Sequence, residues 1–345
     1  MRDYLTTKGI NLSRATISDV AKLAGVSMKS VSRVMNRESN VSEKLRASVL
    51  AAIDALGYVP DMAARSLAGS RVFVIGALFD NPSPNYIIKV QEGVYSACRE
   101  HGYHLLIETV ATEAADLSEQ VRDILLTARI DGMVLTPPTT ENALIMNILE
   151  MLKIPYARVA SVSFPGRSVS VVMDDEAAAG EVAQHLLALG HRRFGFVGGP
   201  LKHGAAGTRR AGFLAAIAAA GASAVEAEGT FQFTSGIEAG RALLNRANPP
   251  TAIFAANDDM AAGVYAAASE LGLKIPDDVS VVGFDDSYIA VTVWPPLTTI
   301  YQPISEMARR AAQSLIARET REEPIILPHQ LVVRASTGTA PKEAV

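Results

Sequence analysis

The 345-residue chain has one cysteine, Cys98, and no long apolar run. A single cysteine excludes an intrachain disulfide and a cluster of thiolate metal ligands, and it favours a reducing compartment. No segment approaches the roughly 18 apolar residues of a membrane span, and the first residues lack the apolar centre of a signal peptide. We therefore expect a cytoplasmic protein that does not enter the membrane.

Motifs of common enzyme chemistry are also lacking. GxGxxG, GxxxxGK[ST], GxSxG and HExxH do not occur at a strand or helix junction where they would act. Only His101 and His104 approach a metal-ligand spacing, and a surface role suits them better. Asp174-Asp175 and Asp285-Asp286 are adjacent carboxylates that point in different directions, which fits strand-end caps better than an acid/base couple. From the sequence we therefore expect a protein that is not an enzyme and that has no catalytic residue, metal site or cofactor.

Length and charge indicate more than one domain. At about 150 residues per domain, the chain has room for two or three, and its 49% hydrophobic residues suffice for packed cores. Charge is unevenly spread, since residues 1–71 carry a net +5 and the remainder −9. A basic N-terminal part on an acidic body is typical of a protein whose one end meets a polyanion.

Three short helices are predicted in the basic part. Thr16 caps the first, with a carboxylate three residues later, and Gly25 ends it. Ser27 caps a second helix directly afterwards, and Ser42 caps a third. The predicted buried positions of the three helices are Val20, Ala24, Val26, Val31, Leu45, Val49 and Leu56. The first two helices form a helix-turn-helix.

The second helix leaves a polar face outside. A helix lying in the DNA major groove needs long or polar side chains on that face, to contact base edges and phosphates. The alternative is a helical hairpin whose polar face only meets water. The residues concerned are Met28, Lys29, Ser30, Ser32, Arg33 and Asn36.

The segment Ala15–Asn36, ATISDVAKLAGVSMKSVSRVMN, followed by Gly57–Pro60 and Ala63–Leu67, resembles the headpiece and hinge of the LacI/GalR family of bacterial repressors. The resemblance implies a DNA-binding headpiece over 15–59, a hinge over 60–70 and an effector-binding, dimerising body over 71–345. Residues 1–14 precede the usual start of the family. The DNA-binding residues that it implies are Thr16, Ser27, Met28, Lys29, Ser30, Ser32, Arg33, Asn36, Ala64, Arg65 and Leu67.

The hinge is predicted as a helix of about two turns. Helices this short are marginal in water, so this one should form only against its dimer mate and DNA. Leu67 suits a wedge into a minor-groove base step, with Arg65 near phosphates, a role that the matching leucine has in the family. The alternative is a plain linker with Leu67 tucked onto the body.

From Arg71 on, buried-type strands alternate with helices, which predicts an α/β body of two parallel sheets. The family resemblance implies a bilobal, periplasmic-binding-protein-like body. Helices are expected over about 86–101, 115–128 and 142–152 and from near Glu176, Ala206, Ser235 and Met260. The expected strands are 72–79, 103–110, 132–136, 154–160, 169–174, 194–198, 252–257 and 279–285.

Ligands of open α/β sheets bind outside the carboxyl ends of the strands, and polar residues gather there. Carboxylates, amides and an arginine beside an aromatic ring suit a polyhydroxylated ligand. For each residue, a capping or surface role is an equal alternative. Ala160 stands where the family often has a polar residue, and Arg158 either substitutes for it or points elsewhere. The family's cleft positions correspond to Asn81, Arg209, Phe231, Asn257 and Asp285.

The leading hypothesis is a ligand-responsive transcriptional repressor of carbohydrate-utilisation genes. It would bind a near-palindromic double-stranded operator as a homodimer and take a sugar or sugar derivative as effector. The chain ends without an apolar heptad tail, so a dimer is favoured over a tetramer. The main alternative is a cytoplasmic sugar-binding protein of the same bilobal fold that acts on protein partners. A sugar-processing enzyme is a third, which lacks a catalytic set.

Overall fold

The computed structural model describes residues 15–35, 40–58, 71–200 and 203–341. The chain divides into two compact units, residues 1–72 and 73–345. The predicted N-terminal extension, residues 1–14, and the predicted hinge, residues 60–70, lie outside the described residues.

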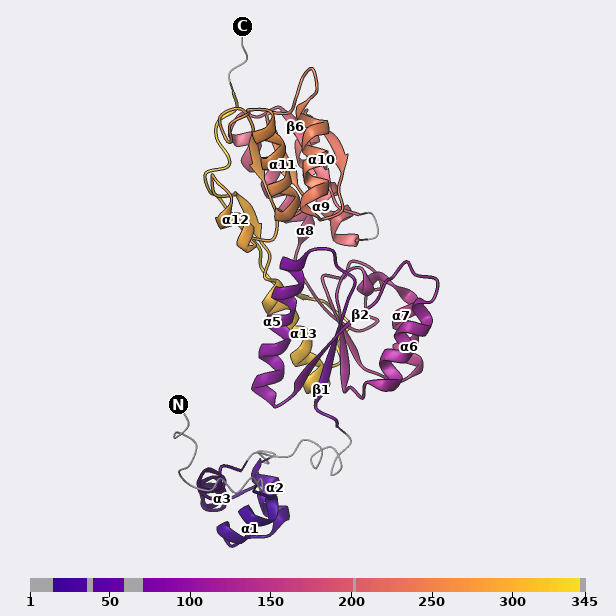
Figure 1. Ribbon diagram of the computed structural model, residues 1–345, viewed down its shortest axis with the longest axis vertical. Helices are drawn as coiled ribbons and strands as arrows, with labels where there is room; N and C mark the ends of the chain where they lie inside the picture. Colours follow the sequence, from indigo (N-terminus) through magenta and orange to yellow (C-terminus); the bar gives the residue numbers. More distant parts are fainter. Residues whose placement is uncertain (1–14, 36–39, 59–70, 201–202, 342–345) are drawn as a thin grey trace, which may run out of the picture. The chain divides into compact units, whose positions relative to one another are not determined.

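The first unit contains the three predicted helices, α1 (Ile17–Ala24), α2 (Met28–Met35) and α3 (Glu43–Leu56) (Figure 1). Thr16 and Asp19 form the reciprocal capping box of α1, and Gly25 ends it in the left-handed conformation, with φ 67°. Ser27 accepts from the amide of Ser30 at 3.1 Å, and Ser42 from that of Leu45 at 3.4 Å. The predicted caps are therefore confirmed.

A small apolar core joins these helices. Leu56, predicted to be buried, is 37% exposed because it lies in the last turn of α3, and Tyr58 beyond the helix is buried instead. The other predicted core positions are buried or partly buried in this cluster. Its buried members are Val20, Ala21, Val31, Val34, Val41, Val49, Ala52 and Tyr58.

Two parallel sheets form the second unit, as predicted. The first has the order β11-β5-β4-β3-β1-β2. Its expected members match the sequence pattern to within a few residues, whereas the short strand β11 was not foreseen. The strands are β1 (Val74–Phe79), β2 (His104–Thr109), β3 (Gly132–Leu135), β4 (Tyr156–Val159), β5 (Val169–Val172) and β11 (Ile325–Ile326).

The second sheet has the order β7-β6-β8-β9. An antiparallel pair, β10 and β12, accompanies it through bridges at the end of β9. Strand β7 was not foreseen, because its alternating small and acidic residues lie at a half-exposed sheet edge. The strands are β6 (Arg193–Gly198), β7 (Ser223–Glu228), β8 (Ala252–Ala255), β9 (Ser280–Val282), β10 (Thr299–Tyr301) and β12 (Gln330–Val332).

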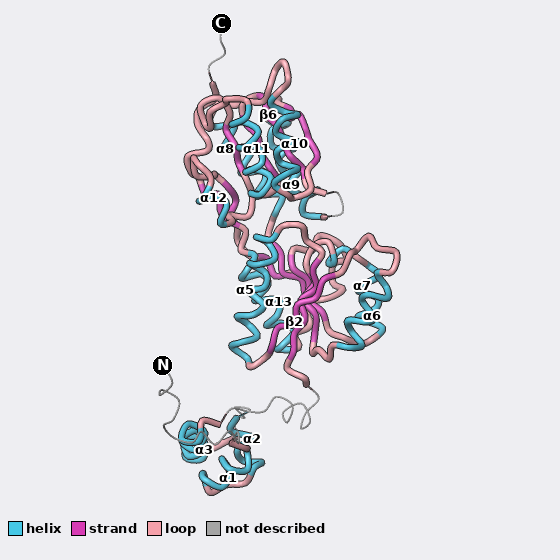
Figure 2. Tube along the Cα trace, viewed as in Figure 1, coloured by secondary structure: helices cyan, strands magenta, loops and turns pink. Residues whose placement is uncertain are grey.

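Helices cover both faces of each sheet. In the first lobe, α5 (Pro84–His101) and α13 (Ile304–Ala317) lie side by side on one face, and α6 (Leu117–Thr127) and α7 (Ala143–Met151) cover the other (Figure 2). Gly93 permits the close approach of α13, because a Cβ there would lie 2.0 Å from the Ser305 carbonyl oxygen.

In the second lobe, two pairs of helices pack together, α8 with α9 and α10 with α11. A short helix, α12, follows β9. Their bounds are α8 (Asp175–Ala188), α9 (Gly204–Ala219), α10 (Phe233–Leu244), α11 (Asp258–Glu270) and α12 (Tyr288–Thr292).

The chain passes between the lobes three times, after β5, between β10 and α13, and between β11 and β12. Because three crossings join the lobes, each lobe is built from segments distant in sequence. Within the described part of the chain, no helix combines the length and the apolar character needed to cross a bilayer.

Candidate functional site

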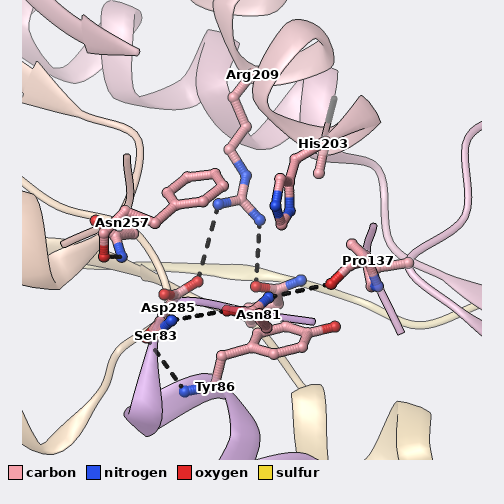
Figure 3. A pocket seen from close by; sticks show the side chains of 12 residues that line it. Asn81, Ser83, Tyr86, Pro137, His203, Arg209, Asn257 and Asp285 are labelled. Carbon is pink, nitrogen blue, oxygen red and sulfur yellow. Dashed lines mark hydrogen bonds and ion pairs between the residues drawn. The ribbon is translucent and has the colours of Figure 1, made fainter. Parts of the chain in front are cut away.

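A pocket lies between the lobes, at the carboxyl ends of strands from both sheets (Figure 3). The space between its walls, open solvent included, is about 390 Å³. The first lobe supplies α5 and the loops after β1, β3 and β4. The second supplies α9 with its N-cap residue and the loops after β7, β8, β9 and β10. The lining residues are Asn81, Ser83, Tyr86, Pro137, Ala160, His203, Ala205, Arg209, Phe231, Asn257, Asp285 and Gln302.

Five of the six predicted effector residues meet in this pocket: Asn81, Arg209, Phe231, Asn257 and Asp285. They come from four separate loops and one helix, so the parallel topology brings them together as expected. The sixth, Arg158, does not line the pocket.

Arg209 is the most constrained of these residues. Its Nε donates to Asp175 Oδ1 at 2.8 Å, Nη1 to the Ala256 carbonyl at 2.7 Å, and Nη2 to Gln302 Oε1 at 3.3 Å. The guanidinium also lies 3.6 Å from the centroid of the Phe284 ring. Arg209 is thus a buried, oriented cation that organises one wall of the pocket.

Asp285 faces this cation, with Oδ1 3.9 Å from Arg209 Nη1 (Figure 3). Burial raises the pKa of the Asp285 carboxyl well above its usual value, and the Arg209 charge opposes that rise only in part. The carboxylate can accept hydrogen bonds from a ligand, and the nearby guanidinium can donate them. Such a pair suits a ligand rich in hydroxyl groups.

Backbone strain gathers at the pocket. Three non-glycine lining residues have positive φ: Ala160 at 54°, Phe231 at 62° and Asp285 at 117°. Each such conformation costs of order 1–3 kcal/mol, and it persists where the surroundings impose it, commonly at functional sites.

Asn81 and Asn257 hold the walls of the pocket. Asn81 donates to the Pro137 carbonyl at 3.3 Å and accepts from the Ser83 amide at 2.9 Å. Asn257 caps α11 by accepting from the Met260 amide at 3.0 Å, and its Nδ2 donates to the Phe231 carbonyl at 3.0 Å. Asn257 thus has the capping role that the sequence left open, whereas Asn81 bonds the backbone of Ser83, which is itself the N-cap of α5.

Phe231 covers the second-lobe side of the pocket. Asn257 holds its carbonyl, and its ring meets His203 edge-on with centroids 5.2 Å apart. Gly199 leaves room for the ring, because a Cβ there would lie 2.3 Å from Phe231 Cζ.

Several pocket residues were missed by the sequence analysis, including His203 and Gln302. Among the described residues, the buried Tyr86 Oη and Gln302 Nε2 have no hydrogen-bond partner, so both remain available to a ligand. Tyr86 lies in the first turn of α5, directly after the polar loop that follows β1, and that position was a usable signal. Gln302 follows β10, whose pairing joins segments distant in sequence, so no local pattern marked it.

The structure places Arg158 away from the pocket because it lies within β4, and not after its end. Its side chain is 1% exposed and bonds the loop that follows β4. Of the two alternatives that the sequence left open, the structure favours the second, in which Arg158 points elsewhere.

In the first unit, α2 buries Val31 and Val34 and turns its other side to solvent. Of the predicted DNA-binding residues, Thr16, Ser27, Met28 and Lys29 are exposed. Ser30, Ser32 and Arg33 are partly exposed, and Arg33 donates to the Asn40 carbonyl at 3.4 Å. The remaining predicted residues, Asn36, Ala64, Arg65 and Leu67, lie outside the described residues.

Two family descriptions match the chain. Residues 16–61 match "Bacterial regulatory proteins, lacI family", and residues 183–337 match "Periplasmic binding protein-like domain". The first match covers the three helices, and the second covers most of the second lobe.

Similarity to individual proteins extends over most of the chain. The ribose operon repressor of Escherichia coli K12 is 35% identical over 311 residues, which cover 89% of this chain and 94% of the repressor. The transcriptional repressor PurR of Proteus mirabilis is 34% identical, with 95% of this chain and 98% of PurR covered. The solved lac repressor dimer, bound to operator and the anti-inducer ONPF, has a TM-score of 0.74 at 29% identity and covers 94% of this chain and 99% of its own.

Proposed function

Because the chain belongs to the lacI family of bacterial regulatory proteins, we propose that it is a ligand-responsive, sequence-specific DNA-binding regulator that represses carbohydrate-utilisation genes. The observation that carries this proposal is the pairing of two features in one chain. A helix-turn-helix exposes the polar face of its second helix, and a separate unit holds a pocket lined by charged, amide and aromatic side chains.

For DNA binding, α2 acts as the recognition helix. Its exposed N-terminal end, with Met28 and Lys29, supports contact with base edges, while Thr16 and Ser27 suit the phosphate backbone. A homodimer would place two such helices on a near-palindromic operator. This proposal puts the protein in the cytoplasm, where operator DNA is found.

For the effector, we propose a sugar or sugar derivative. Asp285 and Arg209 supply a hydrogen-bond acceptor beside a donor, and Phe231 supplies an apolar face. Tyr86 Oη and Gln302 Nε2 have no hydrogen-bond partner among the described residues and can bond a ligand. One relative of the chain, 35% identical, is a ribose operon repressor, and its name supports this class of ligand. A thermal-shift screen of sugars and nucleobases on the full chain would identify it, since a ligand of the folded state raises the melting temperature.

DNA binding is tested with an operator that the wild-type protein selects from a random duplex pool. Lys29→Ala and Arg33→Ala should each weaken binding at fixed salt by about 1–3 kcal/mol, which is roughly 5-fold to 150-fold. Lys44→Ala is the matched control, because Lys44 is an exposed lysine on α3 outside the recognition helix. Failure of the wild-type chain to enrich any duplex at low salt would refute the proposed function.

A further inference from the structure

Arg158 is a buried cation whose partners all lie in one loop. Its Nε donates to Ser168 Oγ at 3.0 Å, and Nη1 donates to Ser161 Oγ at 2.9 Å and to the Ser163 carbonyl at 2.7 Å. Its Nη2 donates to the Phe164 carbonyl at 2.7 Å. In the described part of the chain, no carboxylate lies within ion-pair distance of this guanidinium. Its direct partners are thus neutral oxygens, and Glu141, which does not bond it, contributes a weaker opposite charge nearby.

A buried guanidinium whose direct partners are all neutral is a costly way to hold a loop, because desolvation of a charge costs several kcal/mol. The loop itself is strained, since Ala160 and Phe164 both have φ of 54°. Such conformations persist only when surrounding contacts impose them. The four hydrogen bonds from Arg158 do so, and they fix the loop at the point where Ala160 enters the pocket.

The next residue of the loop, Val162, is held from the other side and points across the cleft. Glu141 Oε1 accepts from the Val162 amide at 2.9 Å. The Val162 side chain lies against Gly204, the first residue of α9 in the opposite lobe. A Cβ on Gly204 would lie 2.0 Å from Val162 Cγ2. The lobes approach this closely because residue 204 has no side chain.

We propose that Arg158 is a positioning residue for closure of the cleft. It fixes the loop over residues 161–168 so that the Val162 side chain packs against Gly204 of the second lobe. Arg158 does not touch the effector. It sets the geometry in which the two walls of the pocket meet. This inference concerns the contact between the lobes and does not depend on the proposed function.

The contact between Val162 and Gly204 is tested by placing a side chain at residue 204. Gly204→Val adds a stiff, branched side chain where Val162 now lies, so the lobes should separate at this point. The bonds from Ser83 and Asn85 to Asp259 join the lobes elsewhere and are not touched by the change. Gly207→Val is the matched control, because Gly207 is in the same helix and a Cβ there has nothing within 4 Å. Val162→Ala, combined with Gly204→Val, should restore at least part of the wild-type geometry.

The readout is the distance between spin labels on Asp123→Cys in α6 and Glu238→Cys in α10, both exposed positions. Burial raises the pKa of the Cys98 thiol to about 12, so the native cysteine stays protonated and unlabelled. We expect Gly204→Val to lengthen the mean distance by at least about 2 Å, a change typical of domain rearrangement. Equal distances in Gly204→Val and Gly207→Val would overturn the proposal.

The role of Arg158 is tested by hydrogen exchange of residues 161–168. Arg158→Met keeps side-chain length but removes all donors, so exchange in this loop should rise and the label distance should lengthen. Arg158→Lys, which lacks the guanidinium fork, should give only partial protection. Unchanged exchange in Arg158→Met would contradict the proposal. If that variant does not fold, the Gly204 and Gly207 pair decides. None of these readouts uses DNA, so failure here is distinguishable from failure of the proposed function.

Discussion

The recognition helix and the pocket use polar side chains in opposite ways. On α2, Met28 and Lys29 are exposed, and the buried residues of the helix are apolar. In the pocket, Arg209 and Asp285 are each only 5% exposed, and most neighbouring polar groups bond one another. A residue of the first kind can change without loss of stability, whereas a residue of the second kind belongs to both the fold and the site.

The difference follows from the two ligands. DNA is a large polyanion that binds an open surface, and its affinity comes largely from counter-ion release. A small ligand must be surrounded, so its site removes polar groups from water before the ligand arrives. Those groups need partners within the protein. The pocket therefore needs a preformed internal network, and the helix does not.

The largest effect is expected from Arg209→Ala, which tests whether a polar residue of the pocket also stabilises the fold. The change leaves the carboxyl groups of Asp175 and Asp285 buried without their cation. Loss of one partner from a buried ionic cluster costs about 3–5 kcal/mol, so the unfolding free energy of the body should fall by that amount in urea titrations.

The control for Arg209→Ala is Arg241→Ala. Arg241 pairs with Glu270 at 2.7 Å, but both side chains are about half exposed. Exposed pairs contribute about 0–1 kcal/mol. Similar losses in the two variants would show that burial does not distinguish the pocket arginine from a surface one.

A smaller effect is expected from Gly199→Ala. The added methyl group would displace the Phe231 ring, whose backbone is held by Asn257. Overpacking of this kind costs about 1–3 kcal/mol, and affinity for a ligand found in the thermal-shift screen should fall with it. Gly207→Ala, in open space on a helix, should instead stabilise the chain by about 0.5–1 kcal/mol. Equal melting temperatures for the two alanine variants would contradict the role of Gly199.

Much of the fold was predictable because its signals are local. Cap residues such as Thr16 and Ser42, and apolar runs such as that of β1, depend only on neighbours in sequence. Strand β11 and the return of α13 to the first lobe were not predicted. Both depend on contacts with strands formed more than about 130 residues earlier.

The pocket residues that could be predicted are those that directly follow a predicted strand. Asn81, Asn257 and Asp285 follow strands, and the parallel topology gathers them. Gln302 joins them through long-range packing that no local pattern shows. His203 lies between β6 and α9, so the strand-end signal applied to it but was not used. Arg158 was ambiguous because its chemistry suits either a ligand or a loop, and only its place inside β4 decides between them.

The smallest effect is expected in the three-helix unit, from a change at the cap residue of α1. Thr16 Oγ1 accepts from the Asp19 amide at 3.3 Å and donates to its carboxylate at 2.7 Å. Thr16→Ala removes this cap, which should destabilise the three-helix unit by about 1 kcal/mol without changing the body. Faster hydrogen exchange over residues 17–24 alone would show it.

Thr16→Ser is the matched control, because serine keeps the capping hydroxyl. Hydrogen bonds from Thr16 lower the pKa of Asp19. A lowered pKa means that the stabilisation is present above the ordinary carboxyl pKa and is lost as pH falls through the lowered value. The wild type and Thr16→Ser should share this acid sensitivity, and Thr16→Ala should have less of it. If Thr16→Ala loses operator affinity while its helix exchange stays unchanged, Thr16 acts through DNA contact and not through the cap.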